Sequence, residues 1–141
     1  MDEKILEHLK LLAKYVNLLK RIAKTKEEEF VKDFVLTGSA ERYLQLAIES
    51  CINIGNRLIS ILQFTHPVST PESYTDIFIE LERLGVVDKD FLQELIKMVR
   101  FRNRLVHLYW NLDNKEVYRI LKEKLEDFEK FKRCVIDYLN K

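Results

Sequence analysis

The spacing of the apolar residues constrains the fold of this chain more than any other feature of the sequence. Apolar residues recur at three- and four-residue intervals almost throughout. This is the period of a helix that buries one face, whereas a half-buried strand alternates residue by residue. Helix-breaking residues are scarce, because 141 residues include only 3 Gly and 2 Pro. We therefore predict an all-α fold, an antiparallel up-and-down helical bundle.

Capping residues and turn residues divide this periodic sequence into helices. Thr25 with Glu28 resembles a capping box, and the LTGSAE stretch with Gly38 is expected to form a turn. Ser73 is expected to cap a helix that ends at Gly85. The helices are predicted over residues 3–24, 25–35, 40–64, 73–84, 88–112 and 113–139, with 40–64 and 88–112 as two long central helices. Without a repeat or a linker, residues 1–141 are expected to form a single domain.

Composition limits the possible function classes. Hydrophobic residues make up 47% of the chain and charged residues 33%, which excludes a disordered protein. The formal net charge is only +1, so binding of nucleic acid would need a local site. Cys51 and Cys134 are typical of free thiols in a reducing compartment. The start MDEKILEHLK lacks the apolar region of a signal peptide, and no apolar run reaches membrane-spanning length, so we expect a cytoplasmic protein without a membrane partner.

Signatures of metal and cofactor sites are missing from the sequence. His8 and His66 are isolated, and no His–Glu pair has the spacing of metal ligands. No glycine-rich loop is available to hold a phosphate. We therefore expect neither a metal nor a cofactor.

The segment RNRLVHLYW, residues 102–110, is unusual because it places polar residues inside an apolar helix. On a helical wheel, the apolar residues of 92–112 cover an arc of roughly 240°, which is wider than one core-facing stripe needs. Arg102 falls in the middle of this arc and Asn103 inside its margin. A buried arginine must pair with an acid or line a groove that admits an anion. Burial alone favours a structural ion pair, for instance with Glu49.

A functional interpretation combines Arg102 with His107. Guanidinium groups suit phosphates, and an imidazole exchanges protons near neutral pH. The two residues are separated by roughly 140° around the helix, so they do not share one face. If two copies of the helix paired across a dimer axis, their arginines and histidines would line one cleft. The alternative for His107 is a satisfied histidine at the edge of the core.

The helix predicted over residues 40–64 carries a polar stripe opposite its apolar face. At helical spacing, this stripe contains Arg42, Glu49, Asn53, Asn56 and Ser60. Asparagine inside a helix lowers its propensity, so the stripe is a candidate groove lining. A solvated surface is the alternative.

The same residues resemble a known family. RNRLVHLY fits the pattern R-x4-H-x-Y with Asn directly after the Arg, which is similar to the signature of HEPN-domain ribonucleases, and of HepT-like toxins in particular. ERYLQLAIESCINIGNRLI resembles the central helix of that family, and PESYTDIFIELERLGVV resembles its next element. Together these pieces span residues 41–121, in the family's order.

The resemblance implies a fold, an activity and roles for the motif residues. It implies a HEPN-like homodimer that cleaves RNA without a metal, with the motif helices at the dimer interface. Arg102 would hold the scissile phosphate and stabilise the charge of the transition state. His107 would act as general acid or base for attack by the ribose 2′-hydroxyl, and Asn103 would orient the phosphate or the histidine.

The resemblance also implies a partner. This is a nucleotidyltransferase (MNT-type) antitoxin, which would silence the toxin by transferring AMP to Tyr109. Tyr109 lies two helical turns from Arg102 on the same face, so AMP there would add negative charge beside the arginine. Two other interpretations stay open, a non-catalytic helical dimer that binds nucleotide or a partner protein, and a structural bundle with Arg102 in an internal ion pair.

Overall fold

The chain folds into a bundle of α-helices. The structure is a computed structural model that describes residues 1–107 and 112–141. All regular structure in these residues is helical, which confirms the predicted all-α fold. The helices are α1 (Glu3–Ile22), α2 (Glu27–Lys32), α3 (Phe34–Leu62), α4 (Tyr74–Arg83), α5 (Lys89–His107), α6 (Asn114–Glu123) and α7 (Leu125–Leu139).

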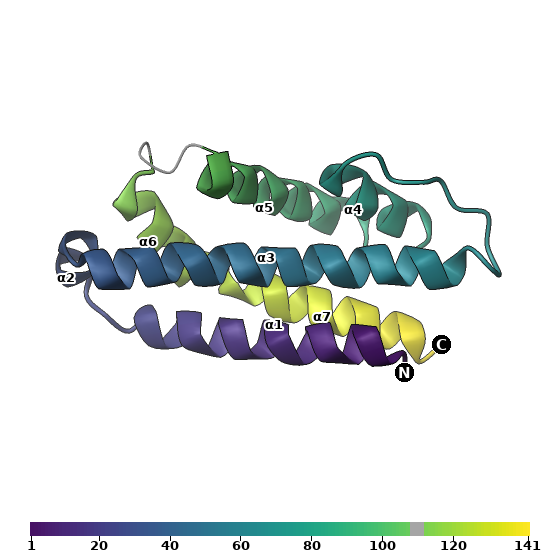
Figure 1. Ribbon diagram of the computed structural model, residues 1–141, viewed down its shortest axis with the longest axis horizontal. Helices are drawn as coiled ribbons and strands as arrows, with labels where there is room; N and C mark the ends of the chain where they lie inside the picture. The colour runs from purple at the N-terminus through teal and green to yellow at the C-terminus, as the bar shows by residue number, and fades with distance from the viewer. Residues whose placement is uncertain (108–111) are drawn as a thin grey trace.

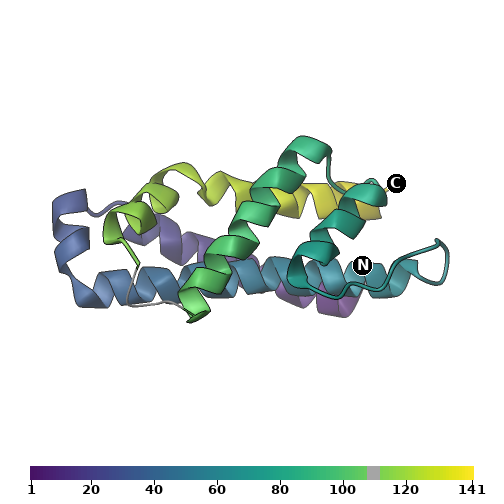
Figure 2. The same cartoon turned by 90° about the horizontal axis from the view of Figure 1, so that it is seen from above.

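Helix α3 is the central element. Helices α1 and α7 lie on one side of α3, and α4 and α5 lie on the other (Figure 1). Seen from above, α5 crosses α3 obliquely, while α2 and α6 lie together at the end of the bundle opposite the two chain termini (Figure 2). Since α3 is covered on both sides, its buried residues run along nearly its whole length, from Thr37 to Leu62.

The boundary between α2 and α3 differs from the prediction. The LTGSAE stretch is helical, and α3 begins at Phe34 rather than near residue 40. Asp33 supplies the cap, because its carboxylate accepts the backbone N–H groups of Val35 (2.9 Å) and Leu36 (3.1 Å). The expected capping box at Thr25 is not formed, since α2 begins at Glu27 without a side-chain cap. Gly38 was therefore wrongly assigned to a turn.

The C-terminal helix predicted over residues 113–139 is two helices. It breaks at Lys124, where α6 ends and α7 begins. The break allows α6 to pack against α2 and α7 to pack against α1. No glycine or proline marks this position, so tertiary packing, which local propensity does not report, sets the boundary.

Side chains of α4 pack closely against α3 at Gly55, which has no side chain. A Cβ atom at Gly55 of α3 would lie 2.7 Å from Cγ2 of Ile77 and 3.1 Å from Cδ1 of Leu81, both on α4. As predicted, Ser73 caps α4 through the N–H of Asp76 (3.1 Å), and Gly85 ends the segment in the left-handed region with φ +86°. Gly55 therefore sets where the first residue of α4, Tyr74, lies relative to α3.

None of the described helices is both long enough and apolar enough to cross a membrane.

Candidate active site

Arg102 lies on α5 and pairs with α3. Its Nε and Nη2 atoms donate to Oε2 of Glu49 at 3.1 and 2.9 Å, and its side chain is only 15% exposed. Gln45 donates to the same oxygen at 3.1 Å. The ion pair to Glu49 expected from burial is thus present, and it joins two helices.

Two further contacts hold the Arg102 side chain. Asn103 accepts a hydrogen bond from Nη1 of Arg102 at 3.3 Å. The guanidinium carbon lies 5.0 Å from the centroid of the Tyr74 ring at the start of α4, which is a cation–π arrangement. Arg102 is therefore oriented by residues from α3, α4 and its own helix. The bond to Asn103 is the longest of the three hydrogen bonds of the guanidinium, and Nη1 takes no part in the hydrogen bonds to Glu49.

His107 is the last residue of α5 and is exposed. Among the described residues, Arg102, Asn103 and Glu49 form one connected group, and His107 lies outside it. This agrees with the angle of roughly 140° expected between the arginine and the histidine on one helix. One chain thus presents the two groups on different faces.

The other predicted site residues fall in different places. Asn53 is exposed on α3 and lines a cleft with Asn56 and Tyr74. Arg42, also exposed on α3, is not among the residues that line this cleft. Tyr109 lies outside the described residues. Sequence reasoning missed Tyr74, because an exposed aromatic residue directly after a helix cap carries no signal of a contact with a distant arginine.

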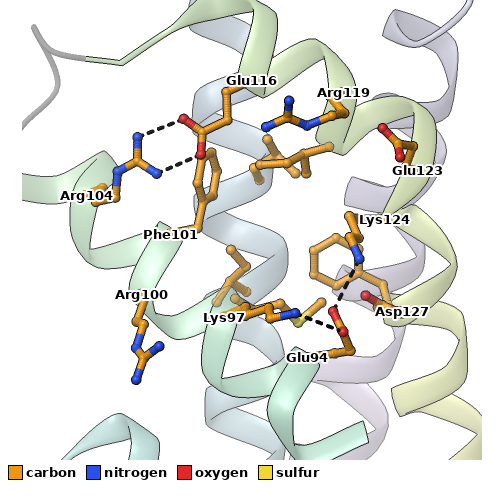
Figure 3. Close-up of a pocket in the computed structure, with 15 residues that line it drawn as sticks. Glu94, Lys97, Arg100, Phe101, Arg104, Glu116, Arg119, Glu123, Lys124 and Asp127 are labelled. Carbon is orange, nitrogen blue, oxygen red and sulfur yellow. Dashed lines mark hydrogen bonds and ion pairs between the residues drawn. The ribbon is translucent and has the colours of Figure 1, made fainter. Parts of the chain in front are cut away.

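A larger cleft lies on the other flank of α5 (Figure 3). It has a volume of about 360 Å³ and opens between α3, α5, α6 and α7. Its rim is built from ion pairs. The guanidinium of Arg104 donates to both oxygens of Glu116 at 2.7 and 2.8 Å, and Glu94 lies 3.3 Å from both Lys97 and Lys124. Neither Arg102 nor His107 lines this cleft, so we place the candidate active site at Arg102 instead.

The Arg104–Glu116 pair connects the two sides of the motif segment. Arg104 is on the last turns of α5, and Glu116 is on the first turn of α6. The hydrogen bond from Arg104 lowers the pKa of Glu116, and the same bond raises the pKa of Arg104. Both groups are therefore charged at neutral pH, and the pair fixes the end of α5 against α6.

The acidic and metal-binding side chains of the described residues do not gather into a metal site. No group of three or more His, Cys, Asp or Glu side chains in this part of the chain is arranged to hold an ion. Arg102 and Asn103 supply a guanidinium and a carboxamide, which suit anion binding, and His107 supplies an imidazole, which suits proton transfer.

Comparison with known proteins gives a consistent result. The family model described as Ribonuclease HepT-like matches residues 5–135. The tRNA nuclease HepT of Aphanizomenon flos-aquae is 26% identical over 133 residues, which cover 93% of this chain and 86% of that protein. The mRNA nuclease HepT of Shewanella oneidensis is 34% identical over 103 residues, which cover 73% of this chain and 74% of that protein.

A solved structure shows the same fold. The tri-AMPylated HEPN toxin of Shewanella oneidensis, in complex with an MNT antitoxin, superposes with a TM-score of 0.88 and 27% sequence identity. The superposition covers 97% of this chain and 99% of the toxin chain. The likeness therefore extends over nearly the whole of both chains.

Proposed function

This chain belongs to the HepT-like ribonuclease family, and on that basis we propose that it is a metal-independent RNA endonuclease, the toxin of a toxin–antitoxin pair. The observation that carries the proposal is the position of Arg102. It is the arginine of the R-x4-H-x-Y pattern, and residues from three helices orient it, with Nη1 outside the hydrogen bonds to Glu49. Residues 1–141 form one HEPN-like domain in this proposal, and the protein acts in the cytoplasm.

The proposed reaction uses the three polar residues at the end of α5. Arg102 binds the scissile phosphate through its Nη1 side, since a guanidinium has five N–H donors and Glu49 occupies the Nε–Nη2 edge. The ribose 2′-hydroxyl attacks the phosphorus, the 5′-oxygen leaves, and a 2′,3′-cyclic phosphate forms. His107 transfers the proton as general acid or base, and Asn103 orients the phosphate.

A homodimer completes this site. Arg102 is largely buried against α3, whereas His107 is exposed at the end of the same helix. Two copies of α5 that meet across a two-fold axis bring the arginine of one chain toward the histidine of the other. The site is then shared between the two protomers, and the dimer is the active form.

The proposed regulator is a nucleotidyltransferase (MNT-type) antitoxin. A relative of known structure is a tri-AMPylated HEPN toxin bound to such an antitoxin. In this chain the acceptor of AMP is Tyr109, the tyrosine of the R-x4-H-x-Y pattern. AMP on this tyrosine adds negative charge and bulk to the motif segment and competes with the RNA phosphate.

The test is cleavage of labelled RNA in EDTA by the unmodified protein and by His107→Ala. We expect cleavage by the parent alone, with cyclic phosphate ends. No cleavage by either protein, from material shown by mass to lack AMP, favours a non-catalytic dimer that binds nucleotide or a partner protein. Retained cleavage by His107→Ala removes the histidine from the chemistry.

A further inference from the structure

A smaller cleft of the described surface is lined by Tyr74, the residue that contacts Arg102. It opens between α3 and the start of α4, with a volume of about 240 Å³. Its apolar lining includes Ile52 and Ile77, and Asn53, Asn56 and Tyr74 line it as well. Pockets that hold drug-sized ligands usually measure about 300–1,000 Å³. The cleft therefore has room for one ring system rather than for a whole nucleotide.

Tyr74 connects this cleft to the candidate active site. The same ring that lies under the guanidinium of Arg102 also lines the cleft. Tyr74 is 44% exposed, so part of the ring is accessible to a ligand. A group bound in the cleft would therefore be one side chain away from the arginine.

The two asparagines are otherwise unexplained. Two polar residues of α3 that flank them in the sequence make long-range contacts, since Glu49 pairs with Arg102 and Arg57 pairs with Asp2. Asn53 and Asn56 lie between them and are exposed, although asparagine is a poor residue for the middle of a helix. A carboxamide carries both donors and an acceptor, which is what the edge of a nucleobase requires.

We propose that this cleft binds one unstacked nucleobase of the RNA, adjacent to the phosphate that Arg102 holds. The inference rests on the proposed function and adds a specificity site to it. Single-stranded RNA is recognised by stacking of splayed bases on aromatic side chains and by hydrogen bonds to the base edges. Tyr74 supplies the stacking surface, and the carboxamides of Asn53 and Asn56 supply the hydrogen bonds.

The charge of the cleft agrees with a base rather than a second phosphate. Its charged lining residue is Glu72, an acid, whereas the cation Arg102 contacts the lining residue Tyr74. A carboxylate repels a phosphate but accepts hydrogen bonds from the amino or imino groups of a base. In this proposal the cleft binds the base of the nucleotide and Arg102 binds its phosphate.

The test is binding, so that it does not depend on cleavage. The His107→Ala protein is titrated with short labelled oligo(A), oligo(C) and oligo(U), and with an abasic ribose-phosphate chain of the same length. The abasic chain keeps the phosphate charge and removes only the bases. We expect at least one homopolymer to bind about tenfold to a hundredfold more tightly than the abasic chain, the range given by one stacked base.

Two variants then locate the contact. The double variant Asn53→Ala, Asn56→Ala should bring the ratio of affinities for the homopolymer and the abasic chain close to one. It should stay folded, because alanine has a higher helix propensity than asparagine. Asn17→Ala is the matched control, since Asn17 is an exposed asparagine in the middle of α1 and should leave the preference unchanged.

Two results would overturn the inference. The first is equal binding of all four oligonucleotides, or of none, by the starting protein. The second is an unchanged base preference in the double variant, and an altered oligomeric mass of that variant would then assign Asn53 and Asn56 to a protein interface. Failure of the nuclease proposal can be told apart from failure of this inference. If the parent protein does not cleave RNA but the base preference is still lost in the double variant, the cleft binds a base and only the nuclease proposal fails.

Discussion

Removing the charge of Glu49 is the sharpest perturbation of the candidate site. Glu49→Gln keeps the length of the side chain and an oxygen acceptor, but it leaves Arg102 without its ionic partner. Exposed ion pairs contribute about 0–1 kcal/mol, and breaking a buried pair costs about 3–5 kcal/mol. The side chains of Arg102 and Glu49 are 15% and 29% exposed, so this pair lies between the two classes. We expect a loss of about 1–2 kcal/mol in the free energy of unfolding.

Stability and activity should respond to this substitution to different degrees. In urea the expected loss moves the unfolding midpoint by roughly 0.5–1 M, and the protein stays folded in buffer because domains are usually stable by about 5–15 kcal/mol. The turnover number for RNA should nevertheless fall by about 100-fold, since a misplaced catalytic group has an effect of that size. The Michaelis constant should not rise, because the substitution also removes a carboxylate that repels the phosphate.

Glu94→Gln is the matched control for this experiment. Glu94 is 30% exposed and pairs with Lys97 and Lys124 at 3.3 Å, but it lies in the larger cleft away from Arg102. Its substitution should lower stability slightly and leave the turnover number unchanged. Equal losses of turnover in the two variants, or a Glu49→Gln protein as active as the parent, would refute the argument that the ion pair positions Arg102 for catalysis.

Two further predictions concern the framework of the site. Gly55→Ala should lower the free energy of unfolding by about 1–3 kcal/mol in a urea titration, because the added Cβ would lie 2.7 Å from Cγ2 of Ile77; unchanged stability would show that α4 moves away freely. The hydrogen bonds from Arg57 and from the N–H of Ile5 lower the pKa of Asp2 to about 2. A lowered pKa in the folded state stabilises the protein above the unfolded pKa, so this contribution should be lost as the pH falls from about 4 to about 2. Asp2→Asn should remove that part of the pH dependence, and parallel curves for variant and parent would contradict it.

The helix ends were predicted well from the sequence where a capping residue or a glycine with positive φ marks them. Ser73 and Gly85 bound the α4 region as expected. The prediction failed at Asp33, because LTGSAE has turn-like composition and yet continues a helix that Asp33 caps. It failed again at Lys124, where residues of good helix propensity on both sides conceal a break set by packing.

Only part of the candidate site was predictable from the sequence. The pairing of Arg102 with Glu49 follows from the need to neutralise a charge in an apolar arc, and this part of the prediction is confirmed. The contact of Tyr74 with Arg102 was not predictable, because it depends on where α4 sits on α3. Gly55 allows Ile77 and Leu81 of α4 to pack close to α3, and the sequence does not show which residues pack against a glycine in a helix.

The pairing of Arg102 has a consequence for how the protein responds to salt. A phosphate that a free cation neutralises releases its counterions, and this release makes nucleic-acid binding weaken steeply with ionic strength. A phosphate that joins an arginine already matched by Glu49 is hydrogen-bonded but not neutralised, so it retains most of its counterions. With a formal net charge of only +1, the chain has little further attraction for RNA in general. Selection of RNA at this site should therefore depend on shape and stacking, and should persist at ionic strengths that release proteins bound mainly by charge.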